Sequence, residues 1–154
     1  MFKSKFEDTN MNSAPLKASI AKTLRAKVIE TYPNIEEHIE EIWPKKAKVL
    51  TLKFKGENQY NFIRIEDEIV FMEMRDRAII PMLRTLHKFP MMMEKMQCDK
   101  GAIRHIFSGS NVMAPGLTSE GGIIAPNLNV GVPVAIMAEG KKHAMGIGYL
   151  QMSS

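Results

Sequence analysis

Two amphipathic helices open the pattern of apolar and polar positions along this chain. From Leu16 onward, apolar residues recur at every fourth position, which predicts a helix with one buried stripe. A second helix is predicted over 34–43, because Asn34 and Glu37 form a capping-box pattern ahead of further apolar residues. The residues before Pro15 are mostly polar, and we expect order to begin near that proline.

The hydrophobic period then changes from four to two. Alternating residues separated by short polar turns predict strands at 49–54, 59–65 and 69–74. A third helix is predicted over 82–88, with Pro81 as its first residue. This order of elements indicates a three-stranded antiparallel meander packed by helices.

The last third of the chain has more glycine punctuation. Asp99 is placed to cap a helix whose apolar residues fall between Ala102 and Phe107, and Gly109 is placed to close it. Pro115-Gly116 and Gly121-Gly122 have turn chemistry. Strands are predicted at 111–114, 134–138 and 143–152. A helix therefore leads into a small sheet.

Charge is distributed unevenly over the 154 residues, whose net charge is +4. Residues 1–95 hold 17 Lys and Arg with 14 Asp and Glu, whereas residues 96–154 hold the remaining 4 and 3. A segment with so few cations could not bind a nucleic acid mainly through counterion release. Any RNA that it binds would have to be recognised by the shape of its end, and a basic docking surface would have to lie upstream.

Three stretches of the last third resemble a PUA domain, an RNA-binding pseudobarrel. They are KGA at 100–102, SGSNVMAPGL at 108–117 and VAIMAEGKKHAMGIG at 134–148. Upstream, the opening MFKSKF, the PKK at 44–46 and PMLRTLHKFP at 81–90 are similar to the malignant T-cell-amplified sequence protein family. This second resemblance covers nearly the whole chain.

The resemblance implies an α+β fold in two parts. We expect an N-terminal pre-PUA domain over 1–95, with helices and an antiparallel sheet, and a C-terminal PUA domain over 96–154. PUA domains of the resembled family continue beyond the position of Ser154 with further sheet and helix. Either the chain is truncated or this copy is short, which leaves the closure of the pseudobarrel open.

The resemblance also implies a function. Members of the family pair with density-regulated protein on the small ribosomal subunit, and the pair acts in tRNA release during recycling and in tRNA delivery during reinitiation. We expect a cytoplasmic, non-catalytic translation factor that binds the small ribosomal subunit and a tRNA acceptor end, with no cofactor and no membrane. The alternatives are an accessory protein of RNA modification and a protein-interaction adaptor with a degenerate PUA domain.

Two sets of candidate contact residues follow. The groove expected of a PUA module, with the basic turn that follows Gly140, gives the RNA-binding candidates Lys100, Arg104, Asn111, Met113, Ala114, Pro115, Gly116, Lys141 and Lys142. A lysine cluster upstream gives the ribosome-docking candidates Lys45, Lys46, Lys48, Lys53 and Lys55. The alternative for both sets is structural, as turn residues, helix caps and solvated lysines.

The sequence predicts no catalytic or metal site. Its four histidines are scattered without the spacing of metal ligands, and Cys98 is the single cysteine. One cysteine excludes an internal disulfide, and a reducing compartment is expected. No secretory pattern or membrane-spanning run is visible.

Overall fold

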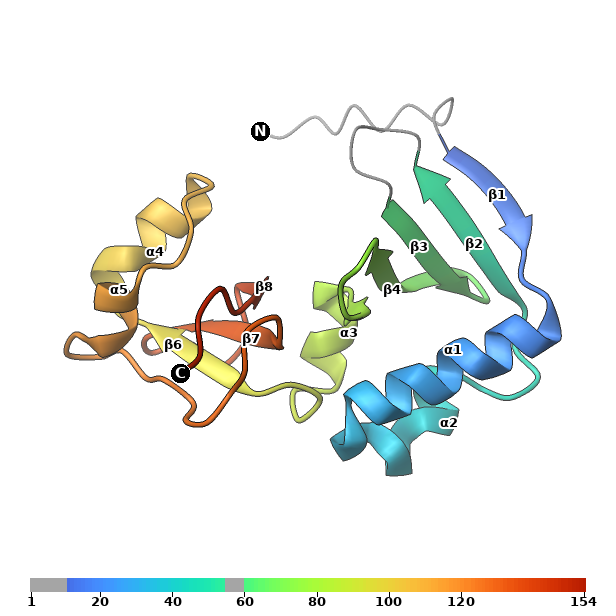
Figure 1. The fold of residues 1–154 in the computed structure, drawn as a ribbon, viewed down its shortest axis with the longest axis horizontal. Coiled ribbons are helices and arrows are strands. Elements are labelled where there is room, and N and C mark those ends of the chain that lie inside the picture. Colours follow the sequence, from blue (N-terminus) through green and yellow to red (C-terminus); the bar gives the residue numbers. More distant parts are fainter. Residues whose placement is uncertain (1–10, 55–59) are drawn as a thin grey trace. The chain divides into compact units, whose positions relative to one another are not determined.

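The chain folds as two compact units that divide between Met82 and Leu83. The computed structural model describes residues 11–54 and 60–154 (Figure 1). Each unit has its own sheet. The predicted α+β class, with an N-terminal helix-and-antiparallel-sheet part, is confirmed.

The first unit is built on a five-stranded antiparallel sheet whose strands follow chain order. They are β1 (Met11–Pro15), β2 (Val49–Phe54), β3 (Tyr60–Ile65), β4 (Glu68–Met74) and β5 (Ile80–Pro81). The predicted meander is confirmed as β2, β3 and β4. The edge strands β1 and β5 were not predicted, and Pro81, expected to begin a helix, lies in β5 instead. Proline is accepted at a sheet edge because it has no N–H to donate.

Three helical segments accompany this sheet: α1 (Ala18–Thr31), a 3₁₀ helix η2 (Pro33–His38) and α2 (Ile39–Ile42). In Figure 1, α1 and α2 lie side by side, joined by hydrogen bonds from Arg25 to Glu40 and to Trp43. The predicted Asn34 cap is wrong, because Tyr32 occupies the N-cap position without a side-chain cap. Pro33 begins the segment, and its fixed φ suits a first helical position.

The core of the first unit lies between the helices and one face of the sheet. Trp43 and Phe71 pack with ring centroids 5.9 Å apart, and both side chains are almost completely buried. Tyr32 donates its hydroxyl hydrogen to the carbonyl of Ile79. The remaining core includes Val28, Ile35, Ile39, Ile42, Val49, Ile63 and Ile65.

The second unit has a three-stranded sheet and three short helices. In chain order they are α3 (Leu83–Lys88), β6 (Lys95–Cys98), α4 (Lys100–Phe107), α5 (Ala114–Thr118), β7 (Pro133–Ala138) and β8 (Gly146–Tyr149). β7 pairs in parallel with β6 and antiparallel with β8. The predicted strand at 111–114 is wrong, because α5 begins at Ala114 with Pro115 in its first turn.

Candidate nucleic-acid interface

The helix α4 begins and ends as its sequence predicts. The side chain of Asp99 accepts a hydrogen bond from the Ala102 N–H at 2.8 Å, which satisfies one of the free amides of the first turn. Gly109 follows the helix with φ of 92°, a conformation that favours glycine. The predicted cap and the predicted glycine stop are therefore confirmed.

Glu139 also lies at the start of α4, and the sequence analysis missed it. Its carboxylate accepts a hydrogen bond from the Lys100 N–H at 3.1 Å and lies 3.6 Å from Lys100 Nζ. The parallel pairing explains this position, because Cys98 pairs with Ala138 and the next residue of each strand reaches the same edge of the sheet. The candidate Lys100 therefore already has an anionic partner, although its side chain remains 76% exposed.

The helix α5 packs closely on the start of α4. The Asp99 N–H donates to the Gly116 carbonyl at 2.9 Å, and a Cβ at Gly116 would lie 2.9 Å from the Ala102 Cβ. Gly116 thus has a packing role whether or not RNA contacts it. Met113, just before α5, exposes 69% of its surface, and Asn111, Ala114 and Pro115 are also exposed.

A glycine turn closes the other side of this region. Gly121 has φ of 88° and lies directly against the Glu139 carboxylate, and its carbonyl accepts a hydrogen bond from Gln97 Nε2 at 2.8 Å. A Cβ at Gly122 would lie 2.4 Å from the Leu117 carbonyl oxygen, which leaves no room for a side chain. The predicted turn is confirmed. Glu139 and Gln97 contact it at Gly121, and Leu117 packs against it at Gly122.

The basic turn after β7 carries the candidates Lys141 and Lys142. Gly140 has φ of 74°, and the Lys141 N–H donates to the Ala138 carbonyl at 3.0 Å. Both lysine side chains are exposed. Glu139 is the first residue of this turn after β7, and it contacts Lys100 at the start of α4.

These segments together form what we call the α4 cradle: the start of α4 at Lys100, helix α5, the Gly121-Gly122 turn and the turn that follows Glu139. The structure brings Lys100 and the start of the basic turn together through Glu139. Arg104 lies one turn further along α4, exposed, with its Nε 3.3 Å from His105 Nε2. The cradle thus combines exposed cations with tightly packed backbone.

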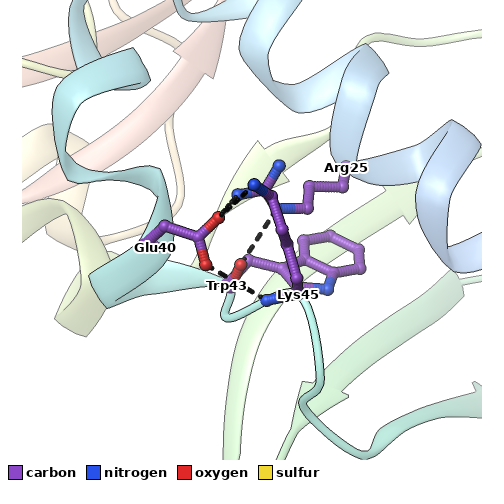
Figure 2. A network of polar contacts seen from close by, with 4 residues as sticks. All are labelled: Arg25, Glu40, Trp43 and Lys45. Carbon is purple, nitrogen blue, oxygen red and sulfur yellow. Dashed lines mark hydrogen bonds and ion pairs between the residues drawn. The ribbon is translucent and has the colours of Figure 1, made fainter.

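The docking candidates lie apart from the cradle in sequence and belong to the first unit. Figure 2 shows that Lys45 joins a network with Arg25, Glu40 and the Trp43 carbonyl. Glu40 Oε1 lies 2.6 Å from Arg25 Nη2 and 3.5 Å from Lys45 Nζ, and its other oxygen accepts the Lys45 N–H at 3.2 Å. Lys45 therefore has an anionic partner, which it shares with Arg25, although its side chain remains 75% exposed.

The pKa of Glu40 follows from this network. Desolvation acts to raise the pKa of this carboxyl, but it is outweighed by the Lys45 backbone hydrogen bond and by the charges of Arg25 and Lys45. The net effect lowers the pKa of Glu40 below its ordinary value.

The other docking lysines do not form one cluster. Lys46 and Lys48 are exposed on the turn before β2, whereas Lys53 is exposed near the far end of that strand. Five residues of extended chain separate Lys48 from Lys53 by roughly 17 Å. Lys55 lies outside the described residues. The hydrogen bond from the Leu16 N–H to the Val49 carbonyl brings exposed Lys17 close to Lys48, a neighbour that the sequence pattern did not indicate.

Groups that could support other chemistry are few in the described part of the chain. Burial raises the pKa of the Cys98 thiol, which makes it a poor nucleophile at neutral pH. Within residues 11–54 and 60–154, no three His, Cys, Asp or Glu side chains gather as metal ligands would. No helix in these ranges combines the length and the apolar character needed to cross a membrane.

Comparisons with known proteins agree with the two-part organisation. Residues 2–90 match a family described as Pre-PUA-like domain, and residues 94–154 match the PUA domain family. A solved structure of a hypothetical protein from Pyrococcus horikoshii OT3 is similar in fold, with a TM-score of 0.69, 24% identity and coverage of 92% of this chain and 83% of that one.

Sequence relatives extend over the full chain. The malignant T-cell-amplified sequence 1 homolog of Drosophila melanogaster is 45% identical, and the match covers 100% of this chain and 84% of that protein. Translation machinery-associated protein 20 of Saccharomyces cerevisiae is 40% identical with the same coverage. Malignant T-cell-amplified sequence 2 of Homo sapiens is 37% identical, again with 100% and 84% coverage.

Proposed function

The chain belongs to the malignant T-cell-amplified sequence family, and on this premise we propose that it is a non-catalytic, translation-associated RNA-binding protein. Two findings support the proposal: the PUA domain match over 94–154, and the printed name of the yeast relative, which associates that protein with the translation machinery. In finer terms, the protein binds the small ribosomal subunit and a tRNA acceptor end in the cytoplasm. It works with a density-regulated-type partner in reinitiation and in tRNA release during recycling.

The observation that carries the RNA-binding part is the α4 cradle. It presents Lys100, Arg104 and Lys141 as exposed cations around backbone that is too tightly packed for side chains at Gly116 and Gly122. Such a surface suits the end of a folded RNA, where phosphates are accessible and few ion pairs are needed. Asn111, Met113 and Lys142 extend the same exposed surface.

The first unit supplies the docking part of the proposal. Lys46 and Lys48 are its strongest candidates, because Lys45 already pairs with Glu40. Lys17 joins them through the contact of Leu16 with Val49. Two weak sites on one chain raise the overall affinity through effective concentration, so that each site alone can be modest.

The test is co-sedimentation with small ribosomal subunits, with and without a density-regulated-type partner, followed by measurement of tRNA retained on the subunit. We expect partner-dependent binding that changes tRNA occupancy. The docking variant Lys46→Gln with Lys48→Gln should bind the subunit less well and with a shallower salt dependence. The charge-matched control is Lys27→Gln with Arg75→Gln. Lys27 lies in the second half of α1 and Arg75 directly after β4, and this variant should bind the subunit as the wild type does.

The cradle variant Lys100→Gln with Lys141→Gln should keep subunit binding and lose tRNA. If the protein binds no subunit but binds a free structured RNA tightly, an accessory role in RNA modification replaces this proposal. If both variants behave as the wild type and RNA binding is absent, the adaptor alternative replaces it.

A further inference from the structure

A pair of histidines far apart in sequence meets in the second unit. His87 on α3 and His143 after β7 have ring centroids 5.2 Å apart, with the planes tilted by 50°. The Nε2 atom of His87 lies 2.7 Å from the Ala144 carbonyl oxygen. Because a carbonyl only accepts hydrogen bonds, this nitrogen carries the hydrogen. This hydrogen bond holds the ring of His87 against the turn that carries His143.

Two lysines border the same shallow depression as the histidines. Lys95 comes from β6 and Lys142 from the basic turn, and both side chains are exposed. The rest of the lining consists of Leu86, Pro90, Ala135, Met137 and Ala144. Among the described residues, no carboxylate lines this depression. We call these two histidines and two lysines the His-Lys cluster.

The His-Lys cluster therefore differs from the two candidate lysines that have a carboxylate beside them. Lys100 has Glu139 beside it and Lys45 has Glu40, whereas the cluster gathers its cations over an apolar floor without an acidic side chain in its lining. Two lysines that border one depression have like charges, and none of the described lining side chains is acidic. A bound anion balances these charges, so that the arrangement favours an anionic ligand.

The position of the cluster indicates which anion. His143 and Lys142 lie on the turn that begins at Glu139, so one turn borders the α4 cradle at its start and the cluster at its end. Because the two surfaces share this turn, the cluster is placed to give an RNA in the cradle a second contact point. A phosphate offers only acceptor oxygens, which match lysine ammonium groups and imidazole N–H groups.

We propose that the His-Lys cluster binds one backbone phosphate of the RNA that occupies the α4 cradle. This inference rests on the proposed RNA-binding function and adds to it a second contact point. It also bears on the small number of cations in residues 96–154: the second unit adds Lys95 from just upstream, and His87 positions the turn that carries Lys142 and His143.

The experiment measures binding of a synthetic RNA hairpin with a single-stranded 3′ end to the full chain over a series of salt concentrations. The variant Lys95→Gln with His143→Gln alters two exposed side chains and leaves the cradle cations Lys100, Arg104 and Lys141 intact. We expect an affinity loss of about tenfold and a salt slope reduced by about 1. The matched control, Lys22→Gln with His38→Gln in the first unit, should bind as the wild type does.

A second measurement does not depend on RNA. Inorganic phosphate is titrated into the wild type while the imidazole NMR signals are followed, and His87 and His143 should shift together whereas His38 should not. If the wild type binds RNA and the cluster variant binds it equally well, the inference is overturned and the proposed function stands. If the wild type binds no RNA, the proposed function fails, and the phosphate titration decides on the cluster: joint shifts support a phosphate site, and their absence overturns it.

Discussion

The two units bury their aromatic and apolar side chains to different degrees. In the first unit, Phe71 is fully buried and packs on Trp43. In the second, none of the residues described in α4 and α5 is buried, and Phe107 and Met113 each expose 69% of their surface. The first unit is thus held by aromatic side-chain packing, whereas α4 and α5 of the second are held by backbone hydrogen bonds and close glycine contacts. The proposed RNA surface therefore lies on the two helices without a fully buried side chain.

The largest effect should come from the core of the first unit. Phe71→Ala removes a fully buried ring and should lower the free energy of unfolding by about 3–5 kcal/mol. Trp43 is the single tryptophan, so its fluorescence in a urea titration reports on this unit. The matched substitution in the second unit, Phe107→Ala, should change stability by less than about 0.5 kcal/mol. Equal losses for both would erase the difference between the units.

Glycine packing should give the next effect. Gly122→Ala forces a methyl group against the Leu117 carbonyl and should destabilise the second unit by about 1–3 kcal/mol. Circular dichroism melts would measure this loss. Gly146→Ala is the control, because a Cβ there would lie at an ordinary contact distance of 3.9 Å from Ile136 Cδ1. If the two variants melt together, the second unit does not depend on the tight turn.

A smaller effect concerns the charge at the α4 cradle. Glu139→Gln removes the acidic partner of Lys100 and should raise RNA affinity about two- to fivefold, the size expected for releasing an exposed ion pair. Fluorescence anisotropy with a labelled RNA hairpin measures the change. Glu36→Gln removes the same charge from an exposed position of the first unit, outside the cradle, and serves as the control. A weaker affinity in Glu139→Gln would show that the carboxylate supports the cradle.

The smallest effect is the pH dependence of the Arg25, Glu40 and Lys45 network. Because the pKa of Glu40 is lowered in the folded protein, its stabilising contribution is present above its ordinary pKa and is lost as the pH falls through the lower, folded-state value. Glu40→Gln should therefore melt below the wild type at neutral pH and together with it in acid. Glu41→Gln is the control and should give no such convergence.

The sequence predicted those features of the fold that depend on residues close together along the chain. The Asp99 cap, the Gly109 stop and the meander from Val49 to Met74 follow from local chemistry and period, and all three are present. The strand expected at 111–114 failed because Pro115 reads equally well as a turn residue or as a first helical residue.

Other features required the tertiary structure. The contact of Glu139 with α4 depends on the parallel pairing of β6 with β7, which no local pattern encodes. The meeting of His87 with His143 joins α3, which precedes β6, with the turn between β7 and β8. The sequence pattern did not indicate a partner for Lys45. In the structure Lys45 pairs with Glu40, and Arg25 joins the same carboxylate through the packing of α1 on α2. Which candidates contact RNA or ribosome remains a prediction.

The parallel pairing of β6 with β7 also sets an order of events during synthesis. The hairpins of β2, β3 and β4 join neighbouring segments and can close as soon as those segments leave the exit tunnel. β6 must wait for Pro133–Ala138 before it has a partner strand, across a long loop that contains α4 and α5. A nascent chain that ends before Pro133 thus carries a foldable first unit and a β6 strand still without its sheet.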